Sequence, residues 1–231
     1  MPATNKLIQK PKVLSEVAAE FIREAIVSGE FCLGDALTEV KLSEMFGISS
    51  TPVREAITIL KREGMIQGES QKVARVFTLS AQQLTQLCRY RFALETSAID
   101  FAMTHDPAGL VARLEALNVE MRHSMEVSDY ETYLQLDRAF HDALFDHAGN
   151  AFLKEGYRCV ANRVATLRTY LSRAPLRVQK SFDEHVKITA ALKEGRLEDA
   201  KATLWTQIDR GTDAEDELRL EIARARKANG Q

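Results

Sequence analysis

Three side chains in the second half of the sequence could bind one metal ion together. Asp137 and His141 are four residues apart, so both project from the same face of a helix. Carboxylate and imidazole groups are suitable ligands for a divalent transition metal. His185 is the next candidate, and it precedes Ile188 and Leu192 at helical spacing, which turns it toward a core. A hydrogen-bonded pair that lines a polar pocket without metal is an equally open interpretation.

A second group of side chains is arranged for contact with nucleic acid. Arg54, Thr58 and Lys61 lie at positions i, i+4 and i+7, so they form one ridge along a helix. The opposite face of that helix carries an apolar stripe, made by Val53, Ala56, Ile57 and Leu60. A polar and basic ridge of this kind suits the major groove of DNA. The alternative is a charged helix face that only contacts solvent.

The helices before the ridge predict a helix-turn-helix. Apolar residues repeat at helical spacing over 14–28 and again over 38–46. Gly47 separates the second of these helices from the ridge helix, which Ser49 or Ser50 can cap. Two helices joined so tightly, with the ridge on the second, have the organisation of a helix-turn-helix.

A wing follows the ridge helix. Residues 65–77 alternate between apolar and polar types around a polar turn at 68–72, which predicts two short strands. Ser80 and Gln83 then have the spacing of a capping box, where a new helix begins. We therefore expect a domain boundary near residue 78.

The rest of the chain is predicted to be helical. The expected helices cover 81–103, 107–127, 130–147, 151–173, 178–194 and 197–226, with connections short enough for antiparallel packing. The predicted fold is therefore mainly α. A winged helix-turn-helix DNA-binding domain over 1–78 precedes an all-α antiparallel helical bundle over 79–231.

Composition is that of an ordinary globular protein, with 45% hydrophobic and 28% charged residues. The sequence shows no signal-peptide pattern and no apolar stretch of membrane-spanning length, so a cytoplasmic location is expected. Its three cysteines are far apart, which argues against a disulfide framework or a zinc ribbon. The net charge of −2 does not favour DNA, but between residues 49 and 75 basic side chains exceed acidic ones by two.

The run IVSGEFCLGDALTEVKLSEMFGISSTPVREAITILKREG, residues 26–64, resembles the DNA-binding domain of the GntR family. The helical remainder resembles the FadR-type effector domain, the FCD domain, through YRFALE at 90–95, LDRAFHDAL at 136–144, AGN at 148–150 and EHVKITAAL at 184–192. This resemblance implies a homodimeric transcription regulator, and we expect it to be a repressor. Its partners would be double-stranded operator DNA and a small organic-acid effector, with no membrane.

On this resemblance the DNA contacts belong to Ser49, Ser50, Thr51, Arg54, Lys61 and Arg62. Arg54 can make a bidentate contact to guanine or hold a phosphate. The neighbours Thr51, Lys61 and Arg62 are expected to serve the DNA backbone. Two positions depart from the family pattern, because Ser50 replaces a common arginine and Val73 replaces a wing glycine. Altered operator contacts are therefore expected.

Metal-binding members of the FCD family have one aspartate and three histidines. The resemblance assigns Asp137, His141 and His185 to the first three positions, whereas the fourth position is Gln207. A neutral amide oxygen is a poorer ligand than imidazole for zinc, nickel or manganese. The expected divalent metal site is therefore weakened, or water replaces the missing ligand.

Arg91 matches the arginine of the family's R-x-x-L-E run, which by resemblance faces the same pocket. A guanidinium would suit a carboxylate effector through a forked, charge-assisted hydrogen bond. An ion pair with Glu95 at i+4 is equally open from the residues alone. The expected effector site contains Arg91, Asp137, His141, His185 and Gln207.

Two other functions remain open at this stage. Aspartate and histidine ligands in a helical bundle can build a metal-dependent hydrolase, here fused to a winged helix. The sequence has no P-loop, no G-x-S-x-G and no H-E-x-x-H motif, so an enzyme is not expected. An architectural DNA-binding dimer without an effector fits every feature except the inward polar cluster.

Overall fold

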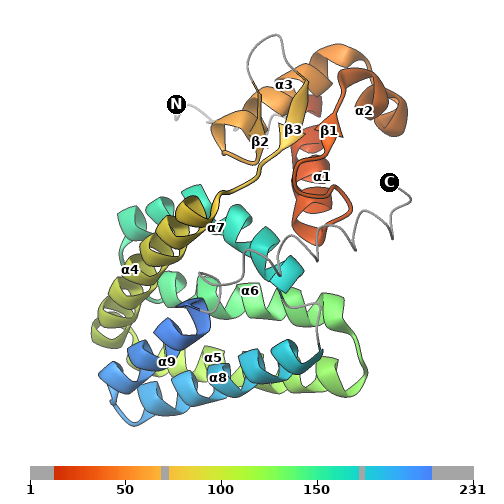
Figure 1. The fold of residues 1–231 in the computed structure, drawn as a ribbon. Coiled ribbons are helices and arrows are strands. Elements are labelled where there is room, and N and C mark those ends of the chain that lie inside the picture. Colours follow the sequence, from red (N-terminus) through yellow and green to blue (C-terminus); the bar gives the residue numbers. More distant parts are fainter. Residues whose placement is uncertain (1–12, 69–72, 172–174, 210–231) are drawn as a thin grey trace, which may run out of the picture. The chain divides into compact units, whose positions relative to one another are not determined.

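The computed structural model describes residues 13–68, 73–171 and 175–209. The chain divides into two compact units between Phe77 and Thr78 (Figure 1). Most of the expected wing turn, and the expected end of the last helix over 210–226, lie outside the described residues. None of the described helices is both long and apolar enough to cross a membrane.

The first unit combines helices with a small sheet. Its helices are α1 (Leu14–Ser28), α2 (Glu39–Phe46) and α3 (Ser50–Arg62). Its strands are β1 (Ala36–Leu37), β2 (Ile66–Gln67) and β3 (Ala74–Val76), which form an antiparallel sheet in the order β1-β3-β2. The predicted two-stranded wing is therefore β2 with β3. The sequence did not indicate β1, because two residues are too few to show an alternating pattern.

Local signals explain the helix-turn-helix. The side chain of Thr38 caps α2 by accepting a hydrogen bond from the Lys41 amide. Gly47 ends α2 at φ +64°, a left-handed conformation that glycine adopts with little strain. The helix α3 begins three residues later and turns its apolar stripe toward α1. Arg23 of α1 and Glu63 at the end of α3 form a forked ion pair, 2.7 Å at its shortest, that ties these helices together.

The described residues of the second unit form helices and the short turns between them, with no strand. Its helices are α4 (Ala81–His105), α5 (Pro107–Glu126), α6 (Tyr130–Asp146), α7 (Ala151–Leu171), α8 (Pro175–Lys193) and α9 (Leu197–Asp209). Ser80 and Gln83 form the predicted capping box at the start of α4. The predicted fold class, a winged helix-turn-helix followed by a helical bundle, is confirmed.

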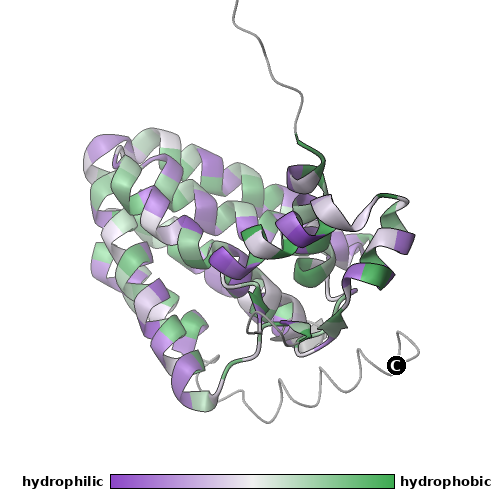
Figure 2. Ribbon diagram, turned by 90° about the horizontal axis from the view of Figure 1, so that it is seen from above, coloured by the Kyte–Doolittle hydropathy of each residue, from purple (hydrophilic) through white to green (hydrophobic). Residues whose placement is uncertain are grey.

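Along the helices of the second unit, hydrophobic residues are interspersed with hydrophilic ones (Figure 2). Side chains such as Leu114, Phe140 and Leu204 are fully buried. The core also contains charged and polar groups, including Glu95 and His141, neither of which is exposed to solvent. Lone buried charges are costly, so such groups need partners within the bundle.

Candidate functional site

The polar ridge of α3 lies on the surface of the first unit. Val53, Ala56, Ile57 and Leu60 are buried, as the helical spacing predicts. On the other side the exposed candidates are Ser49, Ser50, Thr51, Arg54 and Arg62. Lys61 is only half-buried, which leaves its long side chain able to reach solvent. The described surface of α3 therefore presents hydroxyls at its N-terminal end and cations farther along.

The N-terminus of α3 is suited to an anion. Ser49 occupies the N-cap position in an extended conformation, but its side chain makes no capping hydrogen bond. The first amides of a helix have no partner within the helix and carry a partial positive charge. A phosphate at this end could accept hydrogen bonds from those amides and from the nearby hydroxyls.

Arg54, the central cation of the ridge, is held by a residue that sequence reasoning did not single out as a site residue. Its Nε lies 3.0 Å from Oε1 of Glu39, and its Nη2 lies 2.7 Å from Oε2 of the same carboxylate. This contact lowers the pKa of Glu39 and raises that of Arg54. Glu39 opens α2, fifteen positions earlier in the chain. The fork therefore spans the turn of the helix-turn-helix.

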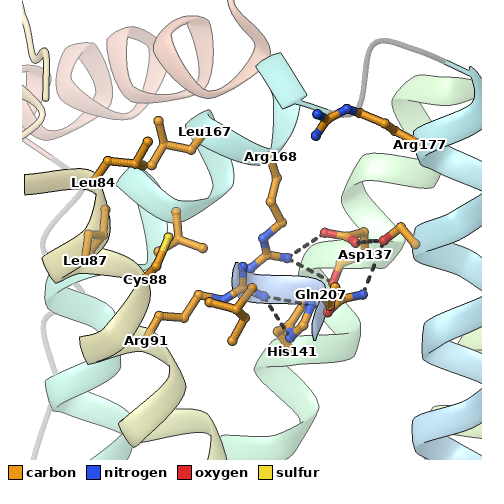
Figure 3. Close-up of a pocket in the computed structure, with 13 residues that line it drawn as sticks. Leu84, Leu87, Cys88, Arg91, Asp137, His141, Leu167, Arg168, Arg177 and Gln207 are labelled. Carbon is orange, nitrogen blue, oxygen red and sulfur yellow. Dashed lines mark hydrogen bonds and ion pairs between the residues drawn. The ribbon is translucent and has the colours of Figure 1, made fainter. Parts of the chain in front are cut away.

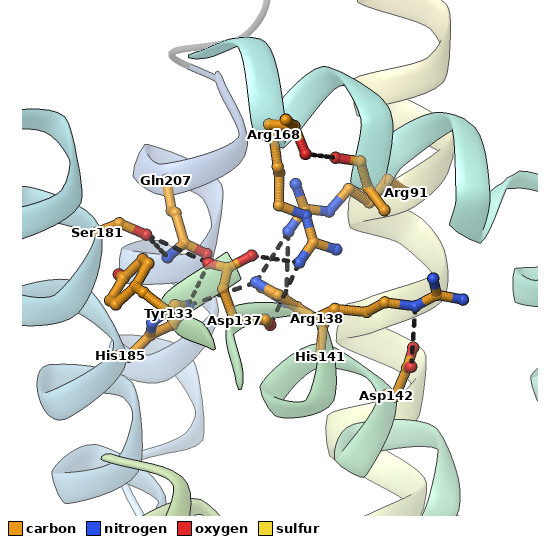
Figure 4. A network of polar contacts seen from close by, with 12 residues as sticks. Arg91, Tyr133, Asp137, Arg138, His141, Asp142, Arg168, Ser181, His185 and Gln207 are labelled. Carbon is orange, nitrogen blue, oxygen red and sulfur yellow. Dashed lines mark hydrogen bonds and ion pairs between the residues drawn. The ribbon is translucent and has the colours of Figure 1, made fainter. Parts of the chain in front are cut away.

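Asp137, His141 and His185 come together inside the second unit. The first two lie on α6 and the third on α8, and all three are buried. One potential ligand atom from each lies within 4.8 Å of the other two. The Nε2 atom of His185 is 3.5 Å from Nε2 of His141 and 3.5 Å from Oδ1 of Asp137 (Figure 4). The three side chains that the sequence suggested as metal ligands therefore lie together in the structure.

Glu95 of α4 fixes the orientation of His141. The Nδ1 atom of His141 lies 2.8 Å from Oε2 of Glu95. Burial alone would raise the pKa of Glu95, but Arg91 and His141 outweigh it and lower that pKa to about 2. An ionised carboxylate there accepts the Nδ1 proton, so the lone pair of Nε2 faces His185 and Asp137. A carboxylate behind a histidine in this way is the usual support of a metal-binding imidazole.

Arg168 of α7 orients Asp137 in the same manner. Its Nη1 donates to Oδ2 of Asp137 at 2.6 Å. Burial raises the pKa of Asp137, but Arg168 and the neighbouring histidines hold it well below its usual range. The other carboxylate oxygen, Oδ1, lies 3.5 Å from Oγ of Ser181 and faces the histidines. Asp137 is therefore an anion whose second oxygen is directed into the cluster.

The donor set fits a divalent metal. Burial lowers the pKa of His185 to about 3 and lowers that of His141, so both imidazoles are neutral near pH 7. Neutral imidazoles and an ionised carboxylate are the protonation states that a metal requires. Gln207 donates from Nε2 to Ser181 at 3.3 Å, while its buried Oε1 has no hydrogen-bond partner. That amide oxygen is an acceptor without a donor at the edge of the cluster.

Arg91 fulfils both of the arrangements that the sequence left open. Its Nε donates to Oε1 of Glu95 at 2.6 Å, which is the i+4 ion pair. It also lines the pocket with His141 and Gln207. Its Nη2 lies 3.3 Å and 3.1 Å from the two ring nitrogens of His141, within hydrogen-bonding distance of both. Arg91 therefore contacts the imidazole as well as the carboxylate that supports it.

The pocket has an apolar side and a charged side (Figure 3). Its apolar side is formed by Leu84, Leu87, Cys88, Val164, Leu167 and Ile208. Its charged and polar side contains four of the residues expected from the sequence, Arg91, Asp137, His141 and Gln207, together with Arg168 and Arg177. The expected residue His185 lies behind them and does not line the pocket. Sequence reasoning missed Arg168 and Arg177 and treated Glu95 only as a partner of Arg91. The signal for Arg168 was present, because it interrupts the apolar run VATLRTYL at a position that faces inward.

Family models match both units. The model described as "Bacterial regulatory proteins, gntR family" matches residues 14–76, and the model of the FCD domain matches residues 86–210. The second match alone spans more than half of the chain.

Named relatives and solved structures agree with these matches. The Nta operon transcriptional regulator of Aminobacter aminovorans is 29% identical over 189 residues, covering 81% of this chain and 87% of that protein. The HTH-type transcriptional repressor NanR of Klebsiella aerogenes is 26% identical over 231 residues, covering 88% and 87%. A structure described as a transcriptional regulator GntR from Rhodococcus sp. RHA1 is 25% identical, covers 89% and 97% of the two chains, and superposes with a TM-score of 0.74. E. coli McbR/YncC, 22% identical with coverage of 94% and 99%, shares the fold at a TM-score of 0.71.

Proposed function

The chain belongs to the gntR family of bacterial regulatory proteins and carries the FCD domain. On this premise we propose that it is a transcriptional repressor whose DNA binding is controlled by a small carboxylic acid. The family consists of DNA-binding transcription regulators rather than enzymes, which removes the hydrolase from consideration. The relative NanR is named a repressor, and this supports the proposed sign of regulation. The observation that carries the proposal is the buried cluster around His141, next to a pocket that arginines line.

The proposed operator contacts come from the ridge of α3. Arg54 would read a base, whereas Lys61 and Arg62 would hold phosphates. Ser49, Ser50 and Thr51 would bind a phosphate at the helix N-terminus. A protein that acts on operator DNA works where that DNA is, so we retain the cytoplasm as its expected location.

One recognition helix reads too few base pairs for specificity in a genome. We therefore propose a homodimer, formed through the helical unit, that binds an inverted repeat. Light scattering should give twice the chain mass of 25.9 kDa, and footprinting should protect two half-sites about one helical turn or more apart. A strictly monomeric protein that protects one unsymmetrical site would rule this out.

The proposed effector is a small carboxylic acid. Arg91 and Arg168 place positive charge at the pocket, and guanidinium groups bind carboxylates through paired hydrogen bonds. A divalent ion held by Asp137, His141 and His185 would supply a further positive charge and open coordination positions to such an acid. The apolar side chains across the pocket would contact the carbon skeleton. Without an acid or a metal, the polar edge of the pocket retains the unpartnered oxygen of Gln207.

Metal content can be tested with two variants. Metal analysis of protein purified without chelator should find zinc, nickel or manganese, and Gln207→His should tighten its binding because imidazole is the better ligand. His141→Ala should abolish metal binding. If the wild-type protein contains no metal, and zinc added to it leaves the unfolding midpoint unchanged, the cluster serves as a metal-free hydrogen-bonding site. The test of acid binding then decides the effector proposal.

A further inference from the structure

Arg54 could reach a base through more than one edge of its guanidinium. Guanine O6 and N7 accept two hydrogen bonds, which arginine can donate from Nη1 with Nη2 or from Nε with Nη2. In this structure Glu39 already accepts from Nε and Nη2. The edge that contains Nη1 is the one that remains for DNA.

We propose that Glu39 is a positioning residue that sets the sequence specificity of this regulator. Glu39 holds Arg54 in the orientation that reads a base, and its own negative charge disfavours DNA that offers no matching base. The inference rests on the proposed function, since it assumes that α3 enters the major groove. It adds a residue of α2 to the recognition surface.

The first effect of Glu39 is preorganisation. The side chain of Arg54 is 65% exposed and, without a partner, would sample many rotamers. A binding partner must otherwise meet the entropy cost of fixing it. The two-bond fork with Glu39 fixes both the position and the plane of the guanidinium before DNA arrives. Only a base with two acceptors in that plane can use the remaining edge fully.

The second effect of Glu39 is repulsion. Phosphates attract cations on any DNA sequence, so a basic ridge alone binds all sequences. A carboxylate at the same surface weakens that general attraction. The correct operator regains the lost affinity through the base contact of Arg54, whereas other sequences do not. The pair thus lowers non-specific affinity and raises discrimination, as specificity through unfavourable contacts requires.

The neighbouring side chains on α3 are less suited than Arg54 to recognise a base. Ser50 offers only a hydroxyl at a position where the family that the sequence resembles commonly has an arginine. Lys61 is a point charge and cannot make a planar two-bond contact. Of the ridge residues Arg54, Thr58 and Lys61, Arg54 is therefore the one that can distinguish bases through a planar two-bond contact.

The test compares discrimination, not affinity alone. The probes are the duplex that the full-length wild-type chain selects from a random-sequence library, and a scrambled duplex of the same base composition. Glu39→Gln removes the charge but keeps the shape. We expect it to bind the scrambled duplex about threefold more tightly with a salt slope steeper by about one unit. The ratio of selected to scrambled affinity should fall about tenfold or more.

Two further variants separate the fork from a general charge effect. Glu44→Gln removes an exposed carboxylate of the same helix that, among the described residues, forms no hydrogen bond or ion pair with Arg54. It should leave the affinity ratio within about twofold of the wild type. Arg54→Lys keeps the positive charge but cannot form the fork, so it should lose discrimination as Glu39→Gln does. Circular dichroism verifies that each variant is folded.

The outcomes distinguish the inference from the function on which it rests. If Glu39→Gln selects the same motif with an unchanged ratio while Arg54→Ala loses the motif, Glu39 is not a positioning residue and the regulator function stands. An equal loss of discrimination in Glu44→Gln also overturns the positioning role. If the wild-type chain selects no motif, the proposed function fails together with this inference.

Discussion

Each unit of the molecule contains a guanidinium–carboxylate pair at its candidate site, but in opposite surroundings. The side chains of Arg54 and Glu39 are 65% and 37% exposed, whereas those of Arg168 and Asp137 are 12% and 6% exposed. Water and salt screen the first pair, so it contributes little to the stability of the fold. The second pair is largely removed from water, so each member depends on the other. Substitutions at the α3 ridge should therefore change DNA binding with little effect on stability. Substitutions at the pocket should change both stability and ligand binding.

The largest expected effect is on stability at the pocket. Arg168→Ala leaves the carboxylate of Asp137 buried without its cation, which should lower the free energy of unfolding by about 3–5 kcal/mol. Urea denaturation of metal-free protein measures this loss in the free energy of unfolding. Arg158→Ala, an exposed arginine of the same helix, is the matched control and should change little. A loss below about 1 kcal/mol for Arg168→Ala would mean that the pair is open to water.

The opposite pattern is expected at the ridge. Arg54→Ala should leave the unfolding midpoint in urea unchanged, because the side chain is exposed. Binding to the duplex selected by the wild type should weaken about 10- to 100-fold, and the base preference should relax. Fluorescence anisotropy on selected and scrambled duplexes measures both effects. Wild-type affinity in this variant would show that α3 is misassigned as the recognition helix.

Low pH should destabilise the folded protein through the buried histidines of the pocket. Burial lowers the pKa of His185 to about 3, whereas an unfolded histidine titrates near 6.5. Between these values the unfolded chain binds more protons, so stability is present above pH 6.5 and falls as the pH drops toward 3. From pH 7 to pH 5, metal-free protein should lose about 2 kcal/mol of unfolding free energy.

Urea denaturation in the presence of a chelator measures this pH dependence. His185→Gln should reduce the loss, whereas His123→Gln should not, because the side chain of His123 is 75% exposed. An equal pH dependence in the wild type and in His185→Gln would assign the acid sensitivity to other groups.

The smallest effect concerns the DNA backbone. Lys61→Ala should weaken binding to selected and scrambled duplexes by the same factor and lower the salt slope by about one unit. Titrations at several salt concentrations give that slope. If Lys61→Ala instead changed the selected motif, Lys61 would contact bases, and its assignment to the DNA backbone would be wrong.

Sequence periodicity predicted what lies within one helix. It gave the ridge of α3 with Arg54, and it placed Asp137 and His141 on one face of α6, because both arguments need only the 3.6-residue repeat. The winged helix-turn-helix and the helical bundle followed from the order of such elements. Spacing also turned His185 of α8 toward the core, and the resemblance grouped it with Asp137 and His141 and added Gln207 of α9.

Contacts between helices were beyond that reasoning. Glu39 meets Arg54 across the turn between α2 and α3, and Arg168 meets Asp137 from thirty-one positions away. Neither pairing has a sequence period, since each depends on how two helices cross. The sequence could indicate that an inward-facing arginine such as Arg168 needs an anion, but not which one.

The most direct test of the account is whether the pocket controls DNA binding. Affinity for the selected duplex should be measured with and without zinc and a panel of small carboxylic acids, in the wild type and in His141→Ala. The account predicts that at least one acid weakens wild-type binding about fivefold or more, and that His141→Ala does not respond. An acid that raises the unfolding midpoint of the wild type yet leaves its DNA affinity unchanged would contradict the account, as would an undiminished response in His141→Ala.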